Sequence, residues 1–185
     1  MASLASLDDK TLVSLAKRGH DAAFEGLLER HATRLHAVAA RLVGRDEAAD
    51  ILQEATISAY RGLRGFRADA SFCTWMHRIV LNACYAHLRR RPQAREDLEL
   101  PDDAADARPG PLGAAERGQL REALERALTQ LSPEARETFV LIEYGDLDYG
   151  AAAVVLGVQP GTVKSRMSRA RAALRDILER RGFQP

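Results

Sequence analysis

The chain has 185 residues, with 27 Lys plus Arg against 26 Asp plus Glu, a net charge of +1, and 46% apolar but only 5% aromatic residues. This length suits one medium domain or two small ones. The composition has no low-complexity tract, so it excludes collagen-like and wholly disordered chains, and it favours helices over a largely β fold.

No segment predicts a membrane span or a secretory signal. The longest apolar run, residues 151–158, is far shorter than the roughly 20 residues that cross a bilayer. Asp8 and Asp9 stand in the first ten residues, where a secretory signal has a basic region and a long apolar stretch. We therefore expect a cytoplasmic protein.

The charges are unevenly distributed along the chain. Residues 1–91 sum to +4, residues 92–112 to −4 and residues 113–185 to +1, although residues 160–181 alone sum to +5. The acidic stretch is also rich in proline. This pattern predicts two domains joined by an acidic flexible linker, and the basic segments indicate a polyanionic partner.

Four helices are predicted before the acidic stretch. The first spans about 8–18, the third about 46–63, and the fourth spans 71–91 and stops before Pro92. The second helix carries one apolar stripe, which consists of Phe24, Leu28, His31, Leu35, Val38 and Leu42. We expect the histidine on this stripe to be a hydrogen-bonded core residue.

The second half of the chain also reads as helices. One is predicted over 114–131, and another begins at Pro133 with Ser132 as its N-cap. A helix-turn-helix pattern follows. It consists of a helix over 148–156, a Gly-containing turn and a basic helix over 161–174.

The basic helix of this pattern predicts contacts to duplex DNA. Its apolar stripe consists of Val163, Met167, Ala170, Leu174 and Leu178. Outside the stripe lie donors suited to phosphates and base edges, namely Lys164, Ser165, Ser168, Arg169 and Arg171. The alternative is a solvated basic helix on an ordinary bundle.

The helix over 71–91 carries a second nucleic-acid pattern. Its predicted core face consists of Phe72, Met76, Ile79, Ala83 and Ala86. Its other face alternates aromatic, guanidinium and amide groups at Trp75, Arg78, Asn82, Tyr85 and Arg89. Such groups suit an unpaired strand with stacked bases, although a single tryptophan is also typical of a core.

The sequence predicts neither an enzyme nor a cofactor. Cys73, His77, Cys84 and His87 have spacings that suggest a metal site, but one straight helix separates the two pairs by about 10 Å or more. We therefore expect no native metal and treat both thiols as buried apolar groups. The chain has no HExxH, no Gly-rich phosphate loop and no GxSxG.

Taken together, three motifs resemble the extracytoplasmic-function (group 4) sigma factors of bacterial RNA polymerase, in the sigma-70 family. Residues 46–54 resemble region 2.2, residues 72–82 resemble regions 2.3 to 2.4, and residues 161–171 resemble region 4.2. The resemblance implies an alternative sigma factor that binds core polymerase, directs it to −35/−10 promoters and promotes DNA melting.

The same resemblance implies the domain organisation and the partners. Residues 8–91 correspond to a region 2 helical bundle and residues 113–181 to a region 4 helix-turn-helix domain, so the expected fold is all-α with residues 92–112 as linker. The implied partners are the β′ clamp helices and β subunit of core RNA polymerase, promoter DNA as duplex and nontemplate single strand, and an anti-sigma factor.

The resemblance also assigns residues to each contact. The β′ clamp helices would meet Asp50, Gln53, Glu54, Thr56 and Tyr60. The −10 element, including a flipped base, would meet Phe66, Arg67, Ser71, Trp75, Arg78, Asn82 and Arg89. The −35 element would meet Lys164, Ser165, Ser168, Arg169 and Arg171. The acidic linker would thread toward the RNA path or act as a plain tether, through Glu96, Asp97, Glu99, Asp102 and Asp103.

The chain departs from the family pattern at three places. Gly150 replaces a better helix former in the first helix of the helix-turn-helix, at a cost of about 1 kcal/mol. His77 stands where many relatives carry tyrosine, and Trp75 is followed by Met76 rather than by a second tryptophan.

Two other interpretations remain open from the residues alone. In the first, the chain is a conventional DNA-binding regulator that uses only its helix-turn-helix, with the N-terminal domain serving effector binding or dimerisation. In the second, it is a thiol or metal sensor that acts through Cys73 and Cys84.

Overall fold

The computed structural model describes residues 4–90 and 111–183. The first part consists of η1 (Leu4–Ser6), α1 (Asp9–Lys17), α2 (Asp21–Val43), α3 (Arg45–Gly62), η2 (Leu63–Gly65) and α4 (Phe72–Arg90). The second consists of α5 (Pro111–Leu128), α6 (Pro133–Glu143), α7 (Tyr149–Leu156) and α8 (Pro160–Arg180). The described residues contain only helices and connecting turns, which confirms the all-α prediction.

The predicted acidic linker falls almost wholly outside the described residues. The five acidic residues expected to act in the linker lie outside the described residues, so their role stays a prediction. They are Glu96, Asp97, Glu99, Asp102 and Asp103. Within the described part, α5 begins at Pro111, two residues before the boundary expected at residue 113.

Side-chain caps determine where several helices begin. Asp8 accepts a hydrogen bond from the Thr11 backbone N–H at 2.7 Å, and Asp148 accepts one from that of Ala151 at 2.7 Å. Ser132 caps α6 as predicted and is followed by Pro133 at the first helical position. Gly157 adopts the left-handed conformation, with φ of 66°, and ends α7 at the turn before α8.

The first four helices pack side by side around an apolar core that contains Phe24, Leu27, Ile51 and Phe72. His31 lies in this core at 6% exposure, and its Nε2 lies 2.8 Å from the Asp9 carboxylate. The prediction of a hydrogen-bonded core histidine is confirmed.

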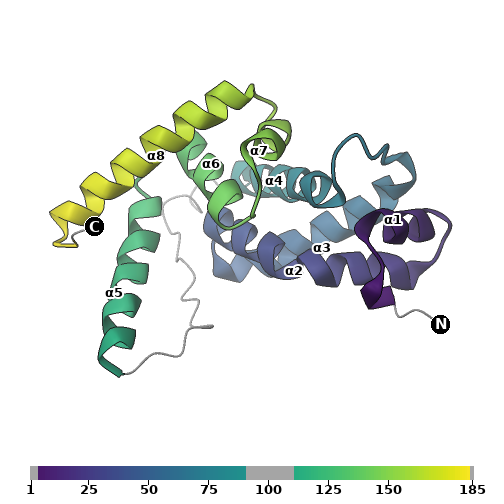
Figure 1. Cartoon of the computed structure of the whole chain (residues 1–185), viewed down its shortest axis with the longest axis horizontal. Coiled ribbons are helices and arrows are strands. Elements are labelled where there is room, and N and C mark those ends of the chain that lie inside the picture. The colour runs from purple at the N-terminus through teal and green to yellow at the C-terminus, as the bar shows by residue number, and fades with distance from the viewer. Residues whose placement is uncertain (1–3, 91–110, 184–185) are drawn as a thin grey trace.

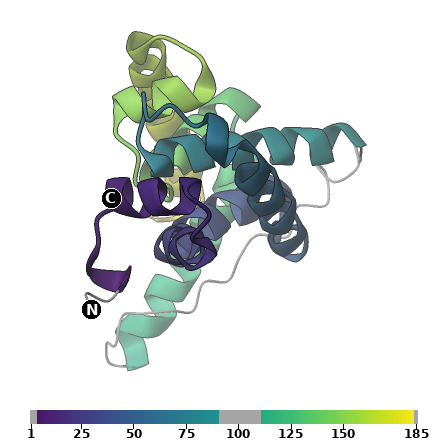
Figure 2. The ribbon, with the colours of Figure 1, turned by 90° about the vertical axis from the view of Figure 1, so that its right-hand side faces the viewer.

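The second half packs directly against the first. Figure 1 shows α6 and α7 between α8 and the first half, where α6 packs on α2 and α7 packs on α4. In the turned view of Figure 2, the yellow-green α7 lies above the teal α4. One continuous apolar core contains buried residues of α4, such as Val80, together with Leu141 of α6 and Val155 of α7. The two predicted helical domains are therefore in contact through a buried interface.

This contact corrects the predicted core face of α4. Ile79, Ala83 and Ala86 are only half-buried, whereas Val80 and Cys84 are almost fully buried. The reason is that α4 packs on α2 and α3 along one side and on α7 along another, so two faces of the helix are covered.

The basic helix α8 is buried largely along the stripe expected from its sequence. Val163, Met167, Ala170 and Leu174 are buried as predicted. The stripe then continues through Ile177, while Leu178, which was expected to be buried, is half-buried. Within the described ranges, no helix is both long enough and apolar enough to span a membrane.

Candidate nucleic-acid interface

The surface of α3 carries the residues expected to bind polymerase. Asp50, Gln53, Glu54 and Tyr60 are exposed, and Thr56 is half-buried. Glu54 forms an ion pair with Arg90 of α4 at 3.2 Å, so its carboxylate is already shared with a neighbouring helix. The Tyr60 hydroxyl donates a hydrogen bond to Asp21 at 2.8 Å, and this acceptor raises the pKa of the tyrosine.

Ile57 is an exposed apolar residue on this surface that the sequence analysis did not single out. It is 45% exposed, and Tyr60, one turn further on, is 52% exposed. Its spacing, four residues after Gln53 and three before Tyr60, is the signal that could have found it. The α3 surface therefore combines acidic and amide groups with an exposed apolar centre.

The loop and first turn of α4 hold a cluster of three aromatic rings. The Trp75 ring lies 4.9 Å from the Phe66 ring and 5.8 Å from the Phe72 ring, measured between centroids. Phe66 is only 7% exposed, and its carbonyl accepts a hydrogen bond from Lys17 at 2.8 Å. The Phe66 ring packs against Trp75, and the expected contact of Phe66 with the −10 element stays a prediction.

The remaining −10 candidates are on the surface. Arg67, Arg78, Asn82 and Arg89 are exposed, and Trp75 is half-buried. Ser71 is exposed, but its hydroxyl accepts a hydrogen bond from the Thr74 backbone N–H at 3.0 Å and so caps α4. Of the stripe proposed to face DNA, Arg78 and Asn82 are the exposed members within two turns of Trp75.

Tyr85 does not follow the rest of that stripe. Its hydroxyl donates a hydrogen bond to Glu137 of α6 at 2.7 Å, and its ring is half-buried. Burial and the adjacent carboxylate both raise the pKa of Tyr85. The second half of the chain therefore contacts the predicted DNA-facing stripe at Tyr85, while Arg89, one turn further on, is exposed.

His77 is fully buried and does not face solvent. Its Nδ1 lies 2.8 Å from the Cys73 carbonyl, which requires Nδ1 to carry the proton and donate it. Burial lowers the pKa of this imidazole, and the nearby charges of His31 and Arg34 lower it further. The hydrogen bond to Cys73 raises the pKa but does not outweigh these effects. His77 is thus a neutral core residue at the interface with the turn after α6.

Cys84 is a core residue, whereas Cys73, which was also expected to be buried, lies only partly in the core. Cys84 is 1% exposed, and burial raises its pKa to about 12. Cys73 is half-buried and its pKa is also raised, chiefly by burial. Nucleophilic thiols have lowered pKa values, so neither environment favours a reactive cysteine. Among the described residues, no three His, Cys, Asp or Glu side chains gather as a metal site.

The exposed side of α8 carries most of the −35 candidates. Lys164, Ser165, Ser168 and Arg169 are exposed, and the Arg169 Nε donates to the Ser165 carbonyl at 3.3 Å. Arg171 is exposed too, but it forms an ion pair with Glu143 of α6 at 2.9 Å. Its guanidinium is therefore already shared with a carboxylate of a neighbouring helix.

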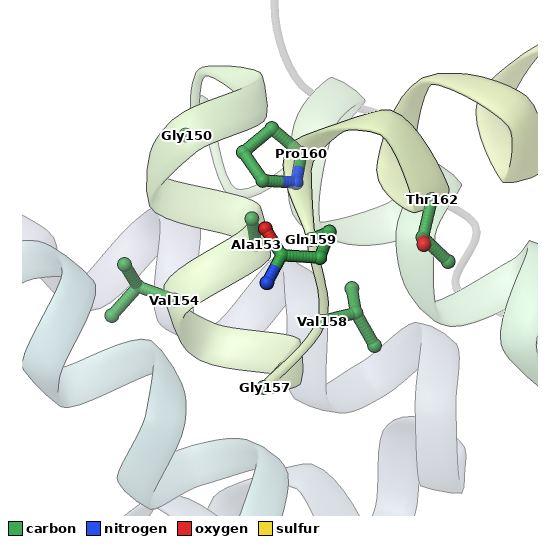
Figure 3. A pocket seen from close by; sticks show the side chains of 8 residues that line it. All are labelled: Gly150, Ala153, Val154, Gly157, Val158, Gln159, Pro160 and Thr162. Atoms are coloured by element: carbon green, nitrogen blue, oxygen red, sulfur yellow. The ribbon is translucent and has the colours of Figure 1, made fainter.

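A shallow hollow of about 590 Å³ lies beside the first turn of α8 (Figure 3). It is lined by Gly150, Ala153, Val154, Gly157, Val158, Gln159, Pro160 and Thr162. None of these side chains titrates near neutral pH, so the hollow has no acid–base or nucleophilic chemistry. It lies at the start of α8, beside Pro160 and Thr162.

Comparisons with known proteins relate both halves of the chain to one family. The family described as Sigma-70 region 2 matches residues 27–93, and the family described as Sigma-70, region 4 matches residues 121–174. The ECF RNA polymerase sigma factor SigM of Mycobacterium tuberculosis is 38% identical over 92% of this chain and 84% of SigM.

Other curated relatives carry names of the same kind. The RNA polymerase sigma-H factor of Pseudomonas aeruginosa is 33% identical over 92% of this chain and 94% of its own length. The ECF RNA polymerase sigma-E factor of Escherichia coli is 31% identical, over 91% and 93%.

Two solved structures have a similar fold. CnrH, in complex with the cytosolic domain of CnrY, has a TM-score of 0.72 at 27% identity and covers 92% of this chain and 97% of its own. The sigma factor RpoE of Bartonella quintana, in complex with the anti-sigma factor NepR, has a TM-score of 0.68 at 28% identity, with 84% and 96% covered.

Proposed function

This chain belongs to the extracytoplasmic-function RNA polymerase sigma factors, which direct polymerase to promoters, and we propose that three of its surfaces divide that work. The α3 surface binds core polymerase, α4 captures the −10 element, and α8 reads the −35 element. The observation that carries this proposal is that one chain, similar to sigma factors along 92% of its length, exposes candidate residues on all three helices.

Binding to core polymerase is assigned to the α3 surface. Gln53, Ile57 and Tyr60 share one exposed side of the helix, and apolar groups ringed by polar ones are typical of protein–protein contacts. Asp50 and Glu54 add negative charge at the edge of this side. We infer that the clamp helices of β′ bind here.

Melting is assigned to α4. Asn82 has donors and acceptors for a base edge, and Arg78 neutralises a phosphate on the same exposed side. Phe66 and Phe72 hold the Trp75 ring in place, so it can stand at the edge of the melted region with little loss of conformational entropy. Capturing unpaired bases offsets the few kcal/mol that it costs to extrude them.

Reading of the −35 element is assigned to Lys164, Ser165, Ser168 and Arg169 on α8. These residues lie within the first turns of the helix, where a recognition helix meets base edges in the major groove. Arg171 is left out of this group because its guanidinium is paired with Glu143. We propose that it supports the helix-turn-helix rather than touching DNA.

Our remaining proposals are based on the relatives of this chain, which are sigma factors. The relatives are sigma factors and not catalytic enzymes, so we propose that this chain acts by binding alone and does no covalent chemistry. It acts with polymerase in the cytoplasm. Because CnrH and the Bartonella RpoE were solved with CnrY and the anti-sigma factor NepR, we propose that an anti-sigma protein also controls this chain.

Transcription in vitro tests the proposal. Core RNA polymerase is incubated with a pool of genomic promoters, with and without this protein, and the 5′ ends of the transcripts are sequenced. We expect protein-dependent start sites that share an upstream motif. If the protein neither binds core nor starts transcripts, yet still binds duplex DNA, the conventional regulator is the correct interpretation.

A further inference from the structure

We propose that Lys17, the last residue of α1, is a positioning residue for promoter melting, because it holds the loop between η2 and α4 in the shape that meets the −10 element. This inference rests on the proposed function. The loop spans residues 66–71, and we call it the −10 loop. It contains three of the residues expected to contact the −10 element, namely Phe66, Arg67 and Ser71.

The first anchor of the −10 loop is the backbone of Phe66. The Lys17 ammonium donates a hydrogen bond to the Phe66 carbonyl at 2.8 Å, although the two residues are 49 positions apart. The Phe66 N–H donates to the Leu63 carbonyl at 3.1 Å, within the preceding turn. A charged donor makes a stronger hydrogen bond than a neutral one. The bond from Lys17 therefore ties this end of the loop to another helix.

The Phe66 ring adds a second contact to this anchor. The ring is 7% exposed, and its centroid lies 4.9 Å from that of Trp75 and 6.4 Å from that of Phe72. A shift of the Phe66 backbone would therefore move a ring that packs against Trp75. Through Phe66, Lys17 affects both the loop and the position of the Trp75 ring.

The second anchor lies at the other end of the −10 loop. The Ser71 hydroxyl accepts a hydrogen bond from the Thr74 backbone N–H at 3.0 Å, and Thr74 is 5% exposed. Between the two anchors, residues 67–70 form no hydrogen bond or ion pair with any other residue that the structure describes. The shape of this stretch therefore depends on how its two ends are held.

Ala68, in the middle of the −10 loop, has a strained backbone. Its φ is 59°, in the left-handed region where a Cβ atom comes too close to the following carbonyl oxygen. Such a conformation persists only where the surrounding structure imposes it. Ala68 is exposed, so the anchors at Phe66 and Ser71 are what impose it. Without the bond from Lys17, we expect the loop to relax into other shapes.

An ordered loop favours the capture of particular bases. A loop that must order itself around an unpaired base loses conformational entropy, and this loss opposes binding. Contacts to one kind of base also depend on exact geometry, whereas attraction to phosphates carries no sequence information. We therefore expect Lys17 to increase the selectivity for −10 bases more than the general affinity for DNA.

The alternative role for Lys17 is a direct contact with a DNA phosphate, since the residue is exposed and basic. The two roles predict different effects of substitution. Loss of a phosphate contact weakens binding to all sequences alike and makes binding less sensitive to salt. Loss of a positioning residue reduces the preference for one base over another.

Tryptophan fluorescence tests the anchor without DNA, because Trp75 is the only tryptophan of the chain. Lys17→Met keeps an unbranched side chain but removes the donor. We expect acrylamide to quench Trp75 more strongly in this variant, because the Phe66 ring is free to move. The matched control is Lys10→Met, an exposed change at the other lysine of α1, and it should leave quenching unchanged. Equal quenching in wild type and Lys17→Met would overturn the proposal.

Transcription from a randomised −10 element tests the effect on promoters. The pool is built from a promoter that the wild-type holoenzyme uses, and each −10 sequence is linked to a barcode inside the transcript. In Lys17→Met, we expect the preference for the best base over the others to fall by about threefold to tenfold. Lys17→Arg keeps a charged donor and should retain most of the preference. A second pool with a randomised −35 element should give wild-type preferences for every variant, which shows that α8 is intact.

Three results would contradict this role of Lys17. The first is a Lys17→Met variant with the wild-type −10 preference. The second is an equal loss on all −10 sequences together with a salt slope reduced by about one unit, which is the pattern of a phosphate contact. The third is a Lys17→Arg variant that is no more selective than Lys17→Met, because the donor would then not be what matters.

The wild-type measurements separate this inference from the proposed function. If the wild-type protein starts no transcripts with core polymerase, the proposed function fails and the inference loses its basis. If the wild-type holoenzyme selects −10 bases and Lys17→Met selects them equally well, only the role of Lys17 fails.

Discussion

The backbone of Gly145 lies so close to His77 that a Cβ atom at position 145 would stand 2.9 Å from the imidazole Nε2. The same atom would lie 2.5 Å from the Leu141 carbonyl. This is the point at which the turn after α6 meets α4, and only a residue without a side chain fits there.

Substitution of this glycine therefore destabilises the protein. We expect Gly145→Ala to lower the free energy of unfolding by about 1–3 kcal/mol, the usual cost of forcing an atom into a packed core. Gly26→Ala is the control, because Gly26 lies inside α2 with no atom within 4 Å of the added Cβ. It should stabilise by roughly 0.5–1 kcal/mol through helix propensity. Urea denaturation measures both, and a shift of the same sign would contradict the close approach.

His77 makes stability depend on pH. Burial holds its pKa in the folded chain below the value of 6.5 that applies when it is exposed in the unfolded chain. As the pH falls, the unfolded chain therefore binds a proton at this histidine at a higher pH than the folded chain does. The contribution of neutral His77 to the free energy of unfolding is present above pH 6.5 and is lost as the pH falls below that value. At about pH 5.5 the loss reaches up to about 1.4 kcal/mol relative to pH 7.5.

Comparison with a His77→Leu variant isolates this effect. The variant loses the hydrogen bond to Cys73, so it is less stable at every pH, but its stability should fall less between the two pH values. Urea midpoints at both values supply the measurement. An identical pH dependence in wild type and variant would show that His77 does not titrate in this way.

Asn82 is expected to matter for melting and not for assembly. Because the Asn82 side chain is exposed on α4, Asn82→Ala should leave folding and core binding unchanged. It should make the free energy of open-complex formation less favourable by about 1–3 kcal/mol. Permanganate reactivity of unpaired thymines in holoenzyme–promoter complexes reports the melting. The control is Glu29→Gln, an exposed change on α2. A variant that melts the promoter normally would remove Asn82 from the −10 contact.

Lys164 is expected to contact a phosphate. Lys164→Ala should weaken promoter binding by the holoenzyme and reduce the slope of log K against log salt by about one unit. Arg175→Ala, exposed further along α8, should change the slope less. Filter binding across a range of salt concentrations gives both slopes. Weaker binding with an unchanged slope would replace the phosphate contact with a base contact.

Local sequence patterns determined the helices and the exposed recognition residues of this protein. The spacing of Val163, Met167, Ala170 and Leu174 specified which side of α8 is buried, and Ser132 followed by Pro133 specified where α6 begins. These features depend on residues within a few turns of each other, so a single helix carries all the information. For the same reason, the three motifs at residues 46–54, 72–82 and 161–171 were sufficient to predict the family.

The docking of the two halves was decided only by the tertiary structure. Arg41 and Glu125 are 84 residues apart, and Tyr85 and Glu137 are 52 apart, so no local sequence pattern connects the members of either pair. Periodicity reports which side of a helix is apolar but not which helix of another domain covers it. For that reason the burial of Phe66, the loss of Tyr85 from the DNA-facing stripe and the second covered face of α4 could not be predicted: each depends on packing between distant segments.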